Sequence, residues 1–237
     1  MKSSKPVHLR EVWADNLVYE FFLIKEAISR FPLVALDTEF PGTIFQLNRD
    51  KSWLSHATPY ENYCLMKWNV DLLKIIQLGM ALSDSHGNLP SFGTEFHYAW
   101  QFNFRDFNIK HDHHNEESIG LLERQELPSD MRSFLGMMRF FFGVRVYDTK
   151  FMMGCISGLH GGLERVAMLL GVERITGSRH QAGSDSLSSL QTFVRFKESC
   201  AKIDLEKLNG YEGMMFGLCE GWLGFTYAPD TFMGTLV

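Results

Sequence analysis

The sequence has few cysteines, no excess of positive charge and no long apolar run. Its four cysteines form no Cys-x-x-Cys pair, which excludes a disulfide framework and favours reduced thiols inside the cell. Lys plus Arg number 23 against 28 for Asp plus Glu, a formal charge of −5, so the chain is not expected to coat duplex nucleic acid through a basic face. Binding of a single nucleic-acid end stays open.

No stretch of 18 apolar residues occurs, and the first 16 residues have no apolar core of signal-peptide length. We therefore expect no membrane association and a location in the cytosol or nucleus. The 237 residues are 45% hydrophobic and 22% charged, as in globular proteins. Because neither a repeat nor a linker interrupts them, we expect one α/β domain over residues 1–237.

Apolar residues in the first half of the chain predict one helix followed by a meander of three strands. Steps of three and four residues predict an amphipathic helix over 8–30, which Pro32 ends. The segment FPLVALDTEFPG is typical of a buried strand, and strands are also predicted within residues 74–88 and 96–104. Residues 105–118 are charged and without a period, which favours a surface excursion.

The helical period returns in the second half. Helices are predicted over 129–142, within 161–171 and from Ser184 onward, with Ser184 as the N-cap, and GVRVYD predicts a short strand. The Met and Phe side chains of FLGMMRFFFG fall at helical spacing, so we expect them in the core rather than in a base-stacking platform.

Two carboxylates follow each other at the end of the first predicted strand. Asp37 and Glu39 are at positions i and i+2 and so point to one face, roughly 7 Å apart along the chain. Such carboxylates repel unless a cation lies between them, and Mg²⁺ and Mn²⁺ choose oxygen ligands. The pattern fits half of a metal site or a strand end whose charges reach solvent.

A second polar group surrounds the start of the last long helix, in HQAGSDSL. Asp185 in a first helical turn complements the helix dipole and by itself needs no metal. His180 lies five residues earlier, in a loop, where an imidazole beside a carboxylate can take a proton from water near neutral pH.

The segments LVALDTEFPG, NVDLLKIIQLGMALSD, WQFNF and HQAGSDSL, in this order, resemble the Caf/Pop deadenylases, the poly(A)-specific ribonucleases of the Ccr-Not complex. The similarity runs from about residue 8 to about residue 217. This family belongs to the His branch of the DEDD exonucleases, and the resemblance implies an RNase H-like mixed sheet with helices on both faces. It also implies that Asp37, Glu39 and Asp185 are metal ligands and that His180 is the general base.

One part of the family pattern is missing. Members carry a strand and helix with a third aspartate before the segment that matches residues 127–143, whereas here ERQE leads directly to Leu127. The fold is thus expected to be truncated by one strand-helix unit, next to the strand of Asp37 and Glu39. Asp148, in VYDTKFM, imitates the missing motif and is a tentative ligand, although by order it matches a later family segment. The GVRVYD strand either fills the vacancy or keeps its family place, and the unbroken later match favours the second.

A rival metal cluster could be drawn from His111, Asp112, His113 and His114, but these residues lie in the charged, aperiodic stretch and have no ligand from a second element. No Gly-rich phosphate loop, GxSxG elbow or HExxH helix occurs in the sequence.

The resemblance implies a 3′→5′ exoribonuclease that shortens poly(A) tails with two divalent cations, Mg²⁺ or Mn²⁺. Its partners would be the 3′ end of single-stranded poly(A) RNA, a Ccr-type nuclease and a Not-type scaffold, in nucleus and cytoplasm. The alternative is a weakened or inactive family member that acts as a binding subunit. Retention of His180 favours the enzyme, and the missing aspartate favours the binding subunit.

Overall fold

The computed structural model describes residues 5–45, 57–104, 127–156, 158–159, 161–201 and 210–218. The chain divides into two compact units. The first comprises Met1–Pro41, Ile75–Phe107 and Gly161–Lys202, and the second comprises Gly42–Lys74, Asn108–His160 and Ile203–Val237. Whether the chain folds as one domain, as the sequence predicts, stays a prediction.

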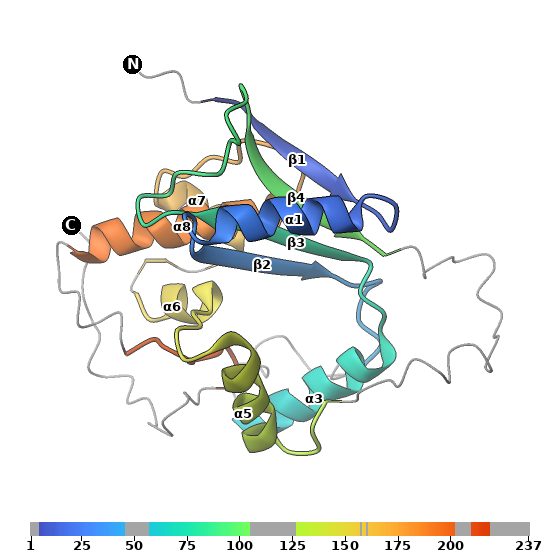
Figure 1. Ribbon diagram of the computed structural model, residues 1–237. Helices are drawn as coiled ribbons and strands as arrows, with labels where there is room; N and C mark the ends of the chain where they lie inside the picture. The colour runs from blue at the N-terminus through green and yellow to red at the C-terminus, as the bar shows by residue number, and fades with distance from the viewer. Residues whose placement is uncertain are drawn as a thin grey trace. The chain divides into compact units, whose positions relative to one another are not determined.

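A four-stranded mixed sheet forms the centre of the first unit (Figure 1). Its strands are β1 (Val7–Val12), β2 (Leu33–Glu39), β3 (Gln77–Ser83) and β4 (His97–Asn103), in the spatial order β1-β4-β3-β2. The pairs β2–β3 and β3–β4 are antiparallel, and β1 runs parallel to β4. The predicted meander of three strands is confirmed, and β1 adds the parallel pair.

Helices cover both faces of this sheet, as expected. On one face α1 (Leu17–Ile28) contributes Ile24 and Ala27 to a cluster with Trp100 of β4. On the other face α8 (Ala182–Ala201) contributes Leu187 and Leu190. Successive strand residues serve opposite faces, which is the period of two that a sheet buried on both sides requires. The predicted short helix is α7 (Leu163–Leu169), which packs against α8.

The prediction of one helix over 8–30 is wrong, because residues 7–12 form β1 and only Leu17–Ile28 is helical. The first four residues of VHLREV alternate between apolar and polar, so the segment fits a strand as well as a helix, and pairing along β4 decides between the two. The buried Glu20 of α1 then accepts two hydrogen bonds from Arg10 of β1, at 2.6 and 2.7 Å, and one from the Trp100 indole at 3.0 Å. Strand and helix are thereby joined at a fully satisfied carboxylate.

The second unit contains α3 (Pro59–Leu72), α5 (Met131–Phe142) and α6 (Thr149–Gly154). Helix α3 was not predicted from the sequence, although Thr58 and Glu61 form a capping box at its start. Tyr63 of α3 is fully buried and its ring lies 5.3 Å from that of Phe134 in α5. The helix predicted over 129–142 is confirmed.

Two expectations for this unit are wrong. The first is core burial of the FFF end of α5, since Phe140, Phe141 and Phe142 are 83%, 69% and 53% exposed. The second is the GVRVYD strand, which does not form. The carbonyl oxygen of Val146 instead accepts a hydrogen bond from the Gly213 amide at 2.8 Å. This backbone acceptor is therefore paired without a neighbouring strand.

Residues 105–118, including the His111–His114 stretch, lie outside the described residues. Among the described residues, no helix is both long enough and apolar enough to span a bilayer.

Candidate active site

The end of β2 presents the two predicted carboxylates. Asp37 pairs with Gly79 and Glu39 with Gln77 in the antiparallel register with β3, and both side chains are half-buried on one face of the strand. Within the described part of the chain β2 pairs only with β3, so it is the edge strand there. On the opposite face, Val34 and Leu36 are each 42% exposed.

The first turn of α8 rests directly on the sheet beside these carboxylates. A Cβ at Gly79 would lie 1.8 Å from the carbonyl oxygen of Ala182, so only glycine fits there. The side-chain oxygen of Gln101, on β4, accepts a hydrogen bond from the Gly183 amide at 3.2 Å. These two contacts fix the start of α8 and bring Asp185 to the face that carries Asp37.

The turn before α8 holds His180 in an uncommon backbone conformation, with φ of +59°. The His180 amide donates to Asp185 Oδ2 at 3.0 Å, and the Ser178 amide donates to the Gln181 side chain at 2.7 Å. Ser184 is not the N-cap that the sequence predicted, because α8 begins at Ala182 and the Ser184 hydroxyl donates to the Thr176 carbonyl at 2.7 Å. The polar residues of HQAGSDSL therefore build the turn as well as the helix start.

Ligand atoms of Glu39, His180 and Asp185 all lie within 4.8 Å of one another. Asp37 belongs to the same cluster electrostatically: burial, followed by the charges of Asp185 and Glu39, raises its pKa from 3.8 to about 7, against the smaller opposing effects of Arg174 and His180. The structure thus brings four predicted residues together from two distant parts of the sequence. Their assigned roles stay predictions.

This cluster fits a divalent cation. Its donors are carboxylate oxygens and one imidazole nitrogen, a set that suits Mn²⁺ and, through the oxygens, Mg²⁺. Crowded carboxylates raise one another's pKa values, and a bound cation relieves that repulsion. At Asp37 the charges of Asp185 and Glu39 add to the larger effect of burial in raising the pKa.

Asp148, the tentative ligand, lies in the second unit, where it caps α6. Its Oδ1 accepts from the Phe151 amide at 3.0 Å and its Oδ2 from the Phe216 amide at 2.9 Å. Both oxygens therefore have a structural use, and a role as a metal ligand stays a prediction.

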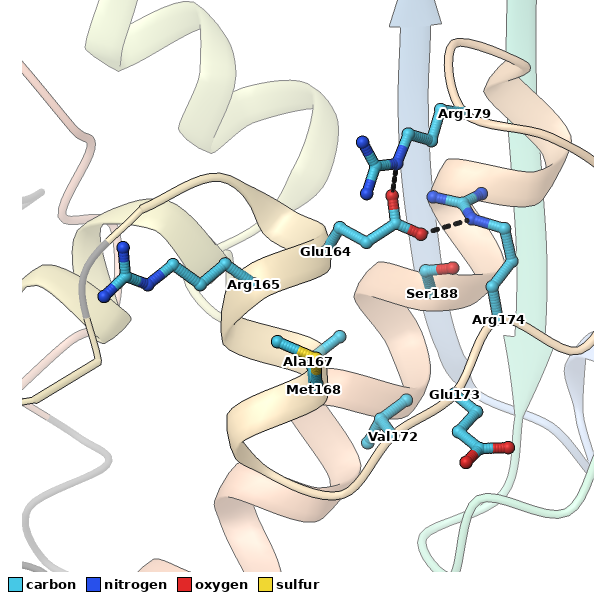
Figure 2. Close-up of a pocket in the computed structure, with 9 residues that line it drawn as sticks. All are labelled: Glu164, Arg165, Ala167, Met168, Val172, Glu173, Arg174, Arg179 and Ser188. Atoms are coloured by element: carbon cyan, nitrogen blue, oxygen red, sulfur yellow. Dashed lines mark hydrogen bonds and ion pairs between the residues drawn. The ribbon is translucent and has the colours of Figure 1, made fainter.

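Sequence reasoning missed Arg174, which lies between α7 and α8. Its guanidinium contacts Asp185 at 2.6 Å and Glu164 at 3.1 Å, and Figure 2 shows Glu164 between the side chains of Arg174 and Arg179. No spacing or motif in the sequence singles out this arginine, because its partners are 10 and 11 residues away on two different helices.

Solved structures of Pop2 and CAF1 proteins share this fold. The Mg²⁺ and Mn²⁺ bound form of S. pombe Pop2p matches with a TM-score of 0.71 and 29% identity, over 89% of this chain and 99% of that one. CAF1 co-crystallized with the yeast NOT1 MIF4G domain shares the fold, with a TM-score of 0.68 and 22% identity over 91% of this chain and 99% of that chain. The fold is thus that of the Pop2 ribonucleases.

Sequence comparison gives the family. Residues 12–120 match the CAF1 family ribonuclease profile. The chain is 36% identical to the probable CCR4-associated factor 1 homolog 10 of Arabidopsis thaliana, over 90% of this chain and 92% of the relative. It is 31% identical to the poly(A) ribonuclease pop2 of Schizosaccharomyces pombe, over 90% of this chain and 76% of the relative. The chain belongs to the CAF1 family of ribonucleases.

The alignment with the Arabidopsis relative also bears on the missing segment. It spans 271 positions, which exceeds the 237 residues of this chain by 34. At least that many positions of the alignment therefore have no counterpart here. A deficit of this size is large enough for a strand and a helix of average length.

Proposed function

We propose that this protein is a divalent-cation-dependent 3′→5′ exoribonuclease that shortens poly(A) tails and releases 5′-AMP. One observation carries the proposal: Glu39, His180 and Asp185 converge within 4.8 Å in the first unit, with Asp37 in the same electrostatic cluster. Family membership supports ribonuclease chemistry, and a relative named poly(A) ribonuclease supports the substrate.

Three carboxylates, Asp37, Glu39 and Asp185, would hold the cation. When bound, it would supply positive charge to the phosphodiester undergoing cleavage. The number of ions is proposed as two, from the family resemblance and the dual Mg²⁺ and Mn²⁺ form of Pop2p. Titration of Mn²⁺ by calorimetry gives the stoichiometry directly.

His180 acts as the general base in this proposal. Its imidazole takes the proton from the water that attacks the last phosphorus atom, while the bond from that phosphorus to the preceding 3′ oxygen breaks. The products are 5′-AMP and an RNA one nucleotide shorter with a free 3′ hydroxyl. The hydrogen bond from the His180 amide to Asp185 holds this turn beside the carboxylates.

The test is degradation of a 5′-labelled oligo(A) by the purified chain in Mn²⁺ or Mg²⁺, with and without EDTA. We expect stepwise shortening from the 3′ end that EDTA abolishes, and a loss of at least 10²-fold in rate for Asp185→Asn. Arg195→Ala is the matched control, because Arg195 lies on the same helix in an exposed ion pair with Glu198. Shortening that survives EDTA would contradict the proposal.

The second candidate function is that of a binding subunit with little or no activity. One observation favours it: the alignment shortfall of at least 34 positions, which is large enough to include the segment of the third aspartate. Absence of any shortening by a folded protein that binds a NOT1-type MIF4G domain would support this function over the nuclease.

For partners we propose a CCR4-type nuclease and a NOT1-type scaffold, since relatives carry the name CCR4-associated factor and a CAF1 was co-crystallized with the NOT1 MIF4G domain. For location we propose nucleus and cytoplasm. Co-purification of a tagged chain from fractionated cells tests both.

A further inference from the structure

The guanidinium of Arg174 joins α7, the turn before α8 and the first turn of α8 on one side of the candidate metal site. Its Nε donates to Glu164 Oε1 of α7 at 3.1 Å, and its Nη2 donates to Asp185 Oδ1 of α8 at 2.6 Å. Its Nη1 donates to the Ser178 carbonyl at 3.2 Å and to the Ser184 hydroxyl. The Arg174 side chain is only 15% exposed, so these bonds form largely out of water.

These contacts restrain both residues on which the proposed chemistry depends. Arg174 occupies Oδ1 of Asp185, and the His180 amide occupies Oδ2, so the carboxylate cannot rotate freely. Arg174 also binds the Ser178 carbonyl, two residues before His180. The turn is thus held at Ser178 and at the amide of His180, whose φ of +59° costs energy unless neighbouring contacts enforce it.

Glu164 in turn orients Arg174. Its two carboxylate oxygens lie between two guanidinium groups, one oxygen on Arg174 and the other on Arg179 (Figure 2). Because the Glu164 carboxylate is held from both sides, it fixes the plane of the Arg174 guanidinium. A planar guanidinium can direct its N–H groups to several acceptors at once.

We propose that Arg174, oriented by Glu164, is a positioning residue that presents Asp185 to the cation and fixes the His180 turn. The inference deepens the proposed function and rests on it for its catalytic consequence. Each Asp185 oxygen accepts one hydrogen bond and has a second lone pair for a cation. Groups that orient a metal ligand by hydrogen bonds commonly change metal affinity 10- to 100-fold when they are removed.

Positioning and simple electrostatics predict opposite results for Arg174→Ala. Removing a positive charge next to a cation site makes the site more negative, which by charge alone strengthens Mn²⁺ binding. If Arg174 positions Asp185, the freed carboxylate binds Mn²⁺ at least 10-fold more weakly. The sign of the change therefore separates the two accounts.

The experiment is calorimetric titration of the full chain with Mn²⁺ in the absence of RNA. We expect at least 10-fold weaker binding for Arg174→Ala and unchanged binding for Arg195→Ala, which removes the same charge from α8. Arg174→Lys keeps the charge but cannot reach all the acceptors, so it should also bind several-fold more weakly. If circular dichroism shows that Arg174→Ala does not fold, the Arg174→Lys variant is used for the test instead. Unchanged or tighter binding in the folded Arg174 variants overturns the inference.

Glu164→Ala supplies the second arm. Because Glu164 acts through Arg174, the double variant should bind Mn²⁺ no more weakly than Arg174→Ala alone. Additive losses would contradict the proposed order of action. The readout also keeps the two proposals apart: weaker Mn²⁺ binding in a chain that degrades no RNA upholds the positioning role and overturns the nuclease. Full nuclease activity together with unaltered Mn²⁺ binding in the variants upholds the nuclease and overturns the positioning role.

Discussion

Gly79 of β3 and Ala182 of α8 are in backbone contact, so close that a Cβ at Gly79 would lie 1.8 Å from the Ala182 carbonyl oxygen. Gly79 is also the register partner of Asp37 in β2. A single glycine therefore sets how near the helix that carries Asp185 comes to the strand that carries Asp37.

Gly79→Ala should displace the start of α8 and separate Asp185 from the strand carboxylates. We expect a loss of about 2 kcal/mol or more in the free energy of unfolding, because the added methyl meets backbone rather than a flexible side chain. Mn²⁺ binding by the folded fraction should weaken as well. Gly136→Ala is the control, since Gly136 lies inside α5 with no atom within 4 Å of its added Cβ. That variant should be stabilised by about 1 kcal/mol.

Urea unfolding and Mn²⁺ calorimetry measure both variants. Unaltered stability and Mn²⁺ affinity in the Gly79→Ala variant would show that α8 does not depend on this contact.

Asp37 should make stability depend on pH in the absence of metal. Its pKa is raised from 3.8 to about 7, so the folded state holds this proton more tightly than the unfolded state. The free energy of unfolding should therefore fall as the pH rises from about 4 to about 7 and then level off. Asp37→Asn lacks the titration and should melt higher than the unaltered chain above pH 7, with the advantage shrinking toward pH 4. Melting curves in EDTA test this, and an advantage independent of pH would refute it.

His180→Asn tests the general base. Asn tolerates the positive φ of +59° at this position better than most residues, so the turn should persist. Turnover of oligo(A) at saturating Mn²⁺ should fall by about 10²- to 10⁴-fold, while Mn²⁺ affinity changes little. If Mn²⁺ binding is lost as fully as in Asp37→Ala, His180 is a ligand rather than a base.

Asp148→Asn, measured beside Asp185→Asn, tests the tentative ligand. Asn is as good a helix cap as Asp, but its amide nitrogen cannot accept from the Phe216 amide. We expect a loss of about 1 kcal/mol in stability and a small effect on nuclease activity. Equal collapse of activity in both variants would show that Asp148 serves the metal site.

Arg10→Ala should destabilise the first unit by about 3 kcal/mol, because Glu20 is only 2% exposed and would keep a buried charge without its ion-pair partner. The double variant Arg10→Met with Glu20→Leu should lose less, since it removes both charges. Urea unfolding of the two proteins shows which of them has the larger free energy of unfolding. A single variant as stable as the double one would contradict this account.

Local pattern was sufficient to predict much of the fold. The strands β2, β3 and β4 are short apolar runs between turn residues, and α5 and α7 follow their helical period closely. The same pattern failed at residues 7–12, where three- and four-residue steps overlap with alternation. Pairing with β4, some 90 residues away, made this segment a strand, and no local signal contains that contact.

By itself the sequence determined that Asp37 and Glu39 share one face, since side chains alternate along any strand. Through its motifs it also related them to His180 and Asp185. Only the tertiary structure decided that α8 begins at Ala182, that β2 is the edge strand of the described sheet and that Arg174 joins Asp185 to Glu164. The physical reason is that such contacts are chosen by close packing and by the need to pair buried polar groups. In this fold, close packing and the pairing of buried polar groups are achieved between residues that are distant in sequence.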